Sequence, residues 1–247
     1  MRSTRFALVA VLGMVAAAVV ATPVAAASST AEYIYGLNAD LLWVAIPITL
    51  ITQGALLYAV LKFRNNDEPR PTKENRRLEI TWTVATAIVL LFVGLAAYGV
   101  MAQPDVTGPQ PEIEDDDVEI DVQAFAWGWN FDYETDDGEE FRTTNTGEGL
   151  VIPADTQVYF HLTSADWLHG FHVPDLGLKH DVFPEQTFTI TTQPQEPGVY
   201  QGYCSEYCGQ LHSQMNFPVT IVEPDEFDEW VDEQADEGGD EPVDEDD

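Results

Sequence analysis

The chain has 247 residues, which is enough for one globular core and a membrane anchor, and its formal net charge is -33. From residue 103 onward the basic residues are Arg142 and Lys179 alone, against 37 aspartates and glutamates. This composition excludes nucleic acid as a partner, because phosphate binding needs a basic face. An acidic surface with an ordinary aromatic content is instead typical of proteins that work in concentrated salt.

Residues 1–27 predict a secretory signal peptide. Two arginines precede an apolar run over residues 6–20, and the alanines that follow offer a cleavage site before Ser28. An uncleaved transmembrane helix is the alternative, which Pro23 and the small residues around it disfavour. We therefore expect the mature chain to begin at Ser28.

Two uncharged stretches, 41–61 and 80–101, are each long enough to cross the hydrocarbon core of a membrane. We expect two transmembrane helices within residues 38–103, over about 41–62 and 80–101. Two buried helices of a soluble protein are the alternative, which fits the flanking charges less well. The loop over residues 62–79 holds six of the ten basic residues, which predicts that it lies in the cytoplasm. The mature N-terminus and the residues after Met101 would then lie outside.

The second half of the chain predicts a sheet domain. Residues 104–117 combine prolines with acidic residues and predict a linker. Polar and apolar residues then alternate, and the alternation changes phase after Ala124, which predicts a bulge or a strand that changes sheets. Several short strands without helices between them predict an antiparallel sandwich or barrel over residues 118–223, in a membrane-anchored all-β protein. Residues 224–247 are mostly acidic and predict a disordered tail, with one helical turn around residues 227–231 as the only regular structure.

The segment from residue 204 to 215 carries the clearest chemistry, since it contains both cysteines of the chain. Two thiolates, an imidazole and a thioether follow one another at short intervals: Cys204, Cys208, His212 and Met215. Such soft ligands favour copper, Cu(I) above all, over Mg²⁺ or Ca²⁺. A Cys204–Cys208 disulfide and a zinc site are the alternatives. A disulfide leaves His212 and Met215 unexplained, and zinc rarely takes a thioether ligand.

In ligand types and spacing this segment resembles the binuclear copper A loop of subunit II of haem-copper cytochrome c oxidase. Residues 168–179, which contain His169, and the aromatic stretch 127–133 resemble the same family. The likeness covers about residues 38–222. It implies an extracytoplasmic cupredoxin-like domain carried by two transmembrane helices.

The resemblance implies six copper ligands: His169, Cys204, Glu206, Cys208, His212 and Met215. The two cysteines would bridge two copper ions and each histidine would bind one of them. Met215 would be a weak ligand, and Glu206 would bind through its backbone carbonyl. The Glu206 side chain would also reach a magnesium site shared with subunit I. His172 competes with His169 for the role of second imidazole, and the family pattern selects His169.

Two further residues receive roles from the resemblance. Trp127 matches the aromatic residue through which an electron donor delivers its electron; a core tryptophan on a bulged strand is the alternative. Glu79, at the start of the second helix, matches a glutamate near a proton path in subunit I. Carboxylates also favour helix starts for dipole reasons alone.

The resemblance implies a subunit of a proton-translocating terminal oxidase in the cell membrane, and the acidic composition predicts a halophilic archaeon as its source. It would take electrons from a cytochrome c or a blue copper protein and pass them to the haem-bearing subunit I for oxygen reduction. Subunit III and membrane lipid would be further partners. The alternatives are the copper A subunit of a membrane nitric oxide reductase and a structural subunit II of a quinol oxidase, a branch that usually lacks the copper ligands.

Overall fold

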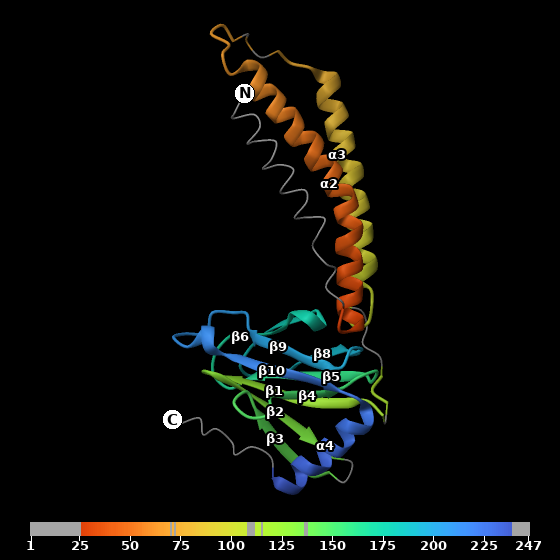
Figure 1. Cartoon of the computed structure of the whole chain (residues 1–247), viewed down its shortest axis with the longest axis vertical. Coiled ribbons are helices and arrows are strands. Elements are labelled where there is room, and N and C mark those ends of the chain that lie inside the picture. The colour runs from red at the N-terminus through yellow and green to blue at the C-terminus, as the bar shows by residue number, and fades with distance from the viewer. Residues whose placement is uncertain are drawn as a thin grey trace.

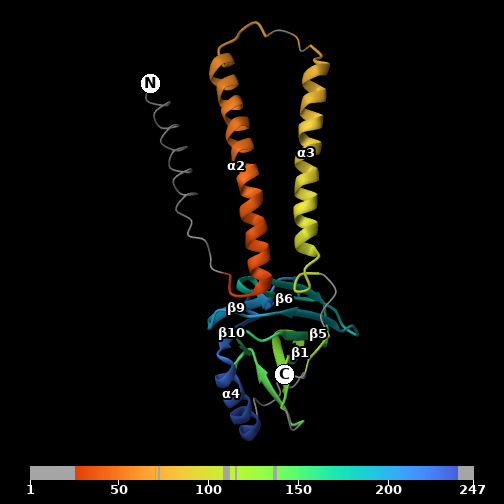
Figure 2. The same ribbon diagram turned by 90° about the vertical axis from the view of Figure 1, so that its right-hand side faces the viewer.

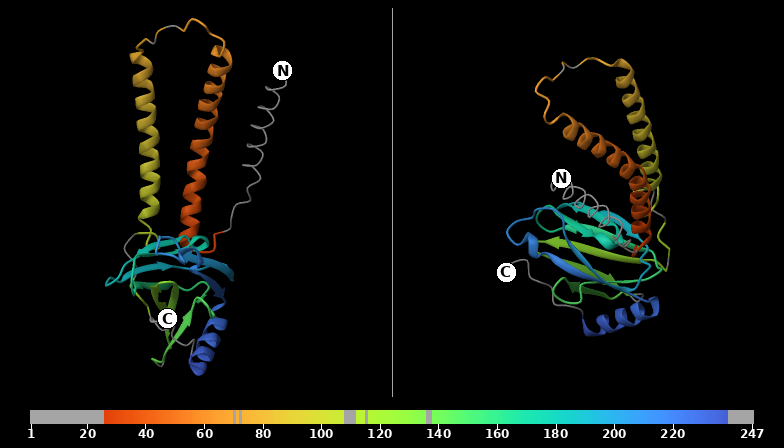
Figure 3. Two further views of the ribbon diagram at one scale, coloured as in Figure 1. Left: turned by 90° about the vertical axis from the view of Figure 1, so that its left-hand side faces the viewer. Right: turned by 45° about the horizontal axis from the view of Figure 1, so that its top comes forward.

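The computed structural model describes a helical hairpin that stands on one side of a β-sandwich (Figure 1, Figure 2). A shorter helix covers the opposite side of the sandwich (Figure 3). The described residues are 26–69, 71, 73–107, 112–114, 116–135 and 138–238, so most of the predicted signal peptide lies outside them. The predicted order of a two-helix hairpin followed by a sheet domain is confirmed.

The hairpin consists of α2 (Ser29–Phe63) and α3 (Arg76–Met101). Each helix begins at a capping side chain that accepts a hydrogen bond from the first turn, Ser28 in α2 and Asn75 in α3. Both helices are apolar and exposed, so by length and composition each is a candidate membrane span. α2 begins earlier than the predicted span over 41–62, because the more polar segment before it continues the helix down to the sandwich.

The sheet domain forms a sandwich of two five-stranded sheets, in the orders β3-β2-β1-β5-β8 and β4-β10-β9-β6-β7. The strands are β1 (Val118–Phe125), β2 (Gly128–Glu134), β3 (Glu140–Thr144), β4 (Leu150–Pro153), β5 (Val158–Ser164), β6 (His169–Val173), β7 (Leu178–Val182), β8 (Phe188–Thr192), β9 (Gly198–Cys204) and β10 (Asn216–Val222).

Both sheets are mixed, which corrects the prediction of a wholly antiparallel domain. β1 runs parallel to β5, and β10 runs parallel to β4, while the remaining pairs are antiparallel. A parallel pair needs a connection longer than a hairpin turn. The chain meets this need by passing through other strands between the two partners of each parallel pair.

The phase change after Ala124 is a hairpin turn rather than a bulge. β1 ends at Phe125, β2 begins at Gly128, and these two residues pair with each other. Ala124 and Trp129 therefore both face the core, on either side of the turn. The expected bulge is wrong, and the turn leaves Trp127 at the edge of the sandwich.

The two sheets enclose an aromatic core that ends at the predicted metal ligands. Trp129, Phe171 and Phe217 contact one another with ring centroids between 5.2 and 5.7 Å apart. Such pairs stabilise a fold by about 0.5–1.5 kcal/mol beyond their buried area. The Trp129 ring also lies 6.3 Å from the ring of His169, so the core supports this histidine directly.

The start of α2 is built into the sandwich. Ala27 is 2% exposed, and the Ser28 hydroxyl donates a hydrogen bond to the Leu176 carbonyl at 2.7 Å. The Ser29 hydroxyl donates to a carboxylate oxygen of Asp105 at 2.6 Å, within the segment predicted as a linker. Hydrogen bonds therefore hold the helices against the sandwich. The predicted cleavage site before Ser28 lies inside this buried junction.

The acidic C-terminal segment forms a helix, α4 (Pro224–Glu237), where the sequence predicts disorder. The Trp230 ring lies 5.2 Å from the Tyr133 ring and 5.6 Å from the Phe141 ring. The prediction is wrong for this segment because its few apolar side chains share one face of the helix and cover the sandwich. Residues 239–247 lie outside the described part of the chain.

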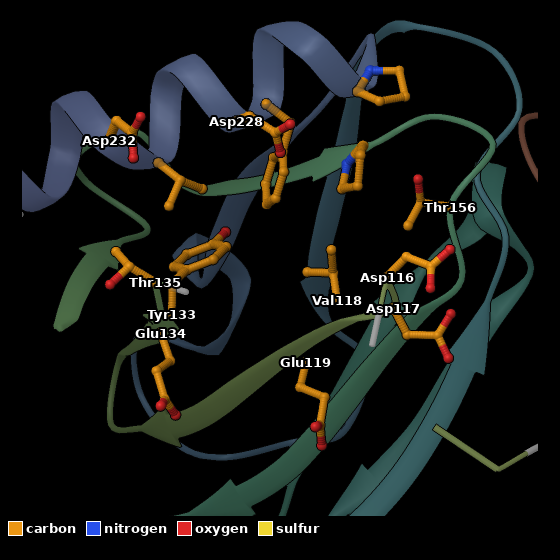
Figure 4. A pocket seen from close by; sticks show the side chains of 14 residues that line it. Asp116, Asp117, Val118, Glu119, Tyr133, Glu134, Thr135, Thr156, Asp228 and Asp232 are labelled. Carbon is orange, nitrogen blue, oxygen red and sulfur yellow. The ribbon is translucent and has the colours of Figure 1, made fainter. Parts of the chain in front are cut away.

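A cavity of about 630 Å³ lies between α4 and the neighbouring strands (Figure 4). Carboxylates form much of its lining: Asp116, Asp117, Glu119, Glu134, Asp228 and Asp232. None of the predicted copper ligands lines it. The cavity is therefore separate from the candidate site.

Substitution of Gly177 tests how much the contact between the hairpin and the sandwich stabilises the fold. Its φ is +67°, and an added β-carbon would lie 3.0 Å from the amide nitrogen of Ala31 in α2. Gly138 has a φ of +79°, but the nearest atom to its added β-carbon would be 3.7 Å away. We expect Gly138→Ala to lower the free energy of unfolding by about 1 kcal/mol through backbone strain. Gly177→Ala should lower it by roughly 2–4 kcal/mol, because overpacking adds to the strain.

Denaturant unfolding of the full chain in detergent measures both losses of stability. Equal losses for the two variants would show that the packing of α2 on the sandwich contributes nothing.

Candidate metal centre

The end of one sheet brings two distant segments together. β6 begins at His169 and β9 ends at Cys204, and the two strands are neighbours with Phe171 paired to Cys204. β10 returns antiparallel to β9, so residues 205–215 form a loop over this end of the sheet. The Cys204 amide closes the loop by donating to the Met215 carbonyl at 3.0 Å. The sheet register thus places the histidine beside the cysteine loop.

The side chains of the sequence motif converge around the two cysteines. The two cysteine sulfurs lie 3.7 Å apart, and both cysteines are free thiols rather than the alternative disulfide. Nδ1 of His169 lies 3.8 Å from the Cys204 sulfur, and Nδ1 of His212 lies 3.5 Å from the Cys208 sulfur. The Met215 sulfur lies 3.7 Å from the Cys208 sulfur. Five predicted ligand side chains therefore meet in one cluster, which we call the sulfur cluster.

Glu206 presents its backbone carbonyl to the sulfur cluster, with the oxygen 3.2 Å from the Cys204 sulfur. Its backbone passes close to Gly170 on β6. A β-carbon at Gly170 would lie 3.0 Å from the Glu206 amide nitrogen and 3.2 Å from its Cγ. The glycine after His169 therefore allows the ligand loop to approach the strand.

Burial makes the charge of the sulfur cluster depend on a metal. Cys204, Cys208, His169 and Met215 are all buried. Burial opposes ionisation of the Cys204 thiol, but its hydrogen bond with His169 and backbone hydrogen bonds outweigh this and lower its pKa to about 6. Burial and the nearby Cys204 thiolate raise the pKa of Cys208 to about 12. Two thiolates at this spacing therefore require a cation beside them.

The chemistry of the ligand atoms fits copper. The ligand atoms of His169, Cys204 and Cys208 all lie within 4.8 Å of one another, as a shared metal site requires. Zinc also binds thiolates and imidazoles. The thioether of Met215 and the mostly soft character of the ligand set favour copper instead. Four of the ligand residues are buried, and His212 is half-buried at the outer side of the cluster.

Asp166, a residue that the sequence motif does not include, orients His169. One carboxylate oxygen lies 2.8 Å from Nε2 of His169, and the other accepts a hydrogen bond from the Ala126 amide at 2.8 Å. An ionised carboxylate only accepts hydrogen bonds, so Nε2 carries the proton and Nδ1 is free to face the sulfurs. The signal in the sequence is a carboxylate three residues before a predicted ligand.

Trp127 lies against the ligand loop. Its indole Nε1 donates a hydrogen bond to the Cys208 carbonyl at 3.2 Å, and its ring would contact a β-carbon placed on Gly209 at 3.1 Å. The side chain is 37% exposed, so it connects solvent with the backbone of a predicted ligand. Trp127 is therefore not the core tryptophan that the alternative interpretation describes. The fully buried tryptophan of this stretch is Trp129.

Two predicted candidates lie outside the sulfur cluster. His172 is on the opposite face of β6 from Phe171 and packs against the Tyr203 ring with centroids 4.8 Å apart. Glu79 lies in the first turn of α3, at the end of the hairpin away from the sandwich (Figure 2). The sheet geometry thus selects His169 over His172.

Two family models match the chain. The cytochrome c oxidase subunit II periplasmic domain matches residues 132–222, and the cytochrome c oxidase subunit II transmembrane domain matches residues 18–100. The probable cytochrome c oxidase subunit 2 of Rickettsia bellii is 30% identical over 216 residues, which cover 83% of this chain and 80% of that protein. Cytochrome c oxidase subunit 2 of Alkalihalophilus pseudofirmus is 34% identical over 215 residues, covering 82% of this chain and 58% of the relative.

Among solved structures, the periplasmic domain of subunit II of cytochrome oxidase from Bradyrhizobium japonicum is similar to part of the chain. It is 25% identical, with a TM-score of 0.46, and the likeness covers 51% of this chain and 99% of that one.

Removal of the Asp166 carboxylate tests its orienting role. Asp166→Ala should weaken copper binding by about 10–100-fold, because His169 loses the partner that holds its ring and its tautomer. Competition with a copper chelator in the detergent-solubilised full chain measures the affinity. Glu148→Gln, in an exposed loop, is the matched control and should bind copper like the unaltered chain. Equal affinity in Asp166→Ala would show that the carboxylate does not support the site.

Proposed function

This chain belongs to the cytochrome c oxidase subunit II family, and on that premise we propose that its sulfur cluster is a binuclear copper A centre. The family membership rests on the matches to both family domains and on the relative at 30% identity. These matches confirm the resemblance that the sequence motifs indicate. The chain is therefore a subunit of an oxidase complex, with a membrane anchor and a sheet domain of the family's periplasmic type.

The proposed ligands are the six residues that the geometry brings together. Cys204 and Cys208 would bridge two copper ions, because each sulfur already has the other and an imidazole nitrogen within 3.8 Å. His169 and His212 would each bind through Nδ1. The thioether of Met215 and the carbonyl of Glu206 would complete the set. The convergence of the buried ligand atoms of His169, Cys204 and Cys208 within 4.8 Å of one another is the observation that carries the proposal.

The proposed role is electron transfer rather than oxygen chemistry. A pair of copper ions held by Cys204 and Cys208 would supply one-electron transfer with little change in the positions of the ligands. The chain supports this role by holding its ligands in place. The Cys204 amide donates a hydrogen bond to the Met215 carbonyl, and the Asp166 carboxylate is hydrogen-bonded to Nε2 of His169. A ligand set closed by protein leaves no open position for a substrate. The oxygen chemistry would therefore belong to another subunit.

The proposed electron path begins at Trp127. Its indole nitrogen donates a hydrogen bond to the Cys208 carbonyl, and its side chain is partly exposed to solvent. The electron donor would be a cytochrome c or a blue copper protein, and the acceptor the haem of subunit I, with subunit III as a further partner. The Glu206 side chain would reach magnesium at the boundary with subunit I. Glu79 would lie near a proton path of that subunit, on the cytoplasmic side.

A copper A subunit of a nitric oxide reductase and a structural subunit of a quinol oxidase are less favoured. The complete set of ligand atoms weighs against a purely structural role, because such a role has no need of two buried free thiols. The relatives that match most of the chain bear the name of the oxidase subunit.

Copper loading of the full chain in detergent tests the proposed centre. We expect a purple mixed-valence species whose paramagnetic resonance spectrum shows one electron shared by two copper nuclei. Cys208→Ser should abolish this spectrum, because it removes one bridging thiolate. A spectrum of isolated copper ions, or a colourless protein with a Cys204–Cys208 disulfide, would contradict the proposal.

Trp127→Phe tests the electron path in the assembled oxidase. The variant loses the hydrogen bond to Cys208 but keeps an aromatic ring, so the copper absorption should stay unchanged. Reduction of the copper centre by a protein electron donor should slow by roughly an order of magnitude, equivalent to about 1.4 kcal/mol at the transition state. Stopped-flow absorbance measures the rate. An unchanged rate would rule out this residue as the path.

A further inference from the structure

The C-terminal helix α4 covers an edge of each sheet of the sandwich. β3 is an edge strand of one sheet, β4 is an edge strand of the other, and α4 contacts both. The edge of a strand offers unpaired backbone groups to other chains, and a covering helix prevents such pairing. Beneath α4, the Tyr133 hydroxyl donates a hydrogen bond to the Val151 carbonyl of β4 at 3.0 Å and accepts one from the Val151 amide at 2.9 Å. Tyr133 and α4 together close this side of the sandwich.

Apolar side chains hold α4 in place. Phe227 is 6% exposed, and Val231 packs against the same core. The Trp230 ring lies 5.2 Å from the Tyr133 ring and 5.6 Å from the Phe141 ring. The Trp230 indole nitrogen is buried without a hydrogen-bond partner among the described residues. The contact is therefore apolar in character, and it carries the cost of one unsatisfied donor.

The charge of α4 opposes this contact. Eight of its 14 residues are acidic and none is lysine or arginine, the acidic ones being Asp225, Glu226, Asp228, Glu229, Asp232, Glu233, Asp236 and Glu237. Several of these carboxylates stand four residues apart, where like charges destabilise a helix. The last turn places acidic residues at the negative end of the helix dipole, with no basic residue to offset them. All eight residues are exposed, so dissolved salt screens their repulsion.

The cavity beneath α4 adds repulsion between the helix and the sandwich (Figure 4). Carboxylates line it from both sides: Asp228 and Asp232 from α4, and Asp116, Asp117, Glu119 and Glu134 from the sandwich. The screening length is about 10 Å at 0.1 M salt and about 3 Å at 1 M salt. Repulsion across the cavity therefore acts in dilute salt and is largely lost in concentrated salt.

We propose that α4 is a salt-dependent strap over the edges of β3 and β4. In concentrated salt it stays docked, and in dilute salt it detaches while the sandwich and the sulfur cluster stay folded. Screening weakens the repulsion between carboxylates but leaves the apolar contacts of Trp230 and Phe227 in place. None of the predicted copper ligands lines the cavity, so detachment does not disturb the metal centre.

Hydrogen exchange measured by mass spectrometry tests the strap in the assembled, copper-loaded oxidase at about 0.1 M and about 1 M KCl. Peptides from residues 224–237 report on α4, and peptides from β1 and β10 report on the sandwich. Each exchange rate is compared with that of the unfolded chain in the same salt. The amides of α4 should exchange about tenfold faster in the dilute salt, because local opening governs their exchange. The sandwich peptides should stay protected in both.

Two double variants separate the cavity from the total charge of the helix. Asp228→Asn with Asp232→Asn removes the helix carboxylates that line the cavity, and should keep α4 protected in the dilute salt. Asp225→Asn with Glu226→Gln is the matched control. It removes the same charge from the first turn, outside the cavity lining, where carboxylates favour the helix dipole. The control should therefore give no recovery of protection.

Trp230→Ala tests the apolar part of the contact. This variant should open α4 at both salt concentrations, because it removes the ring that packs on Tyr133 and Phe141. Its copper absorption should stay unchanged. Loss of that absorption would contradict the inference, since α4 would then support the metal centre.

Equal exchange of α4 at the two salt concentrations would overturn the inference. Loss of protection in β1 and β10 together with α4 would also overturn it, because the sandwich and the helix would then open as one unit. Recovery in the first-turn control as large as in the cavity variant would show that charge across the cavity does not govern docking.

Discussion

The structure depends on the placement of two buried cysteine sulfurs 3.7 Å apart. Two thiolates cannot share so small an apolar space without positive charge, and here only one thiol ionises readily. The fold therefore creates an electrostatic need that a bound metal would meet. The pairing of β6 with β9 brings an imidazole to one sulfur, and the loop that returns into β10 brings an imidazole and a thioether to the other.

The sandwich keeps this cluster rigid from two sides. Beneath it, the core rings of Trp129 and Phe171 pack together and reach His169. Above it, the Asp166 carboxylate accepts hydrogen bonds from His169 and from the Ala126 amide in the turn that carries Trp127. A site whose ligands are held this way needs little rearrangement when its charge changes. At the helical hairpin, the Ser28 hydroxyl bonds the start of α2 to Leu176 of the sandwich, and the Ser29 hydroxyl bonds it to Asp105 after α3.

The parts of the site that depend on local spacing are predictable from the sequence. Cys204, Cys208 and His212 follow one another on a single loop, and two long apolar runs predict the hairpin. Features that depend on long-range pairing are not predictable in this way. The parallel β1–β5 pair joins segments that no local pattern connects, and the bond from Asp166 to Ala126 crosses between loops. The sequence predicts only one turn of α4, around residues 227–231, because the acidic composition outweighs a short apolar stripe whose Trp230 packs on Tyr133 and Phe141.

Native mass spectrometry of the copper-loaded full chain tests the central claim most directly, because it counts what the sulfur cluster holds. The account predicts a mass increase equal to two copper ions, with both cysteines unbonded to each other. It also predicts that this increase disappears when Cys204 and Cys208 are both replaced by serine. An increase of one metal ion, or a loss of two hydrogen atoms from a disulfide, would contradict it.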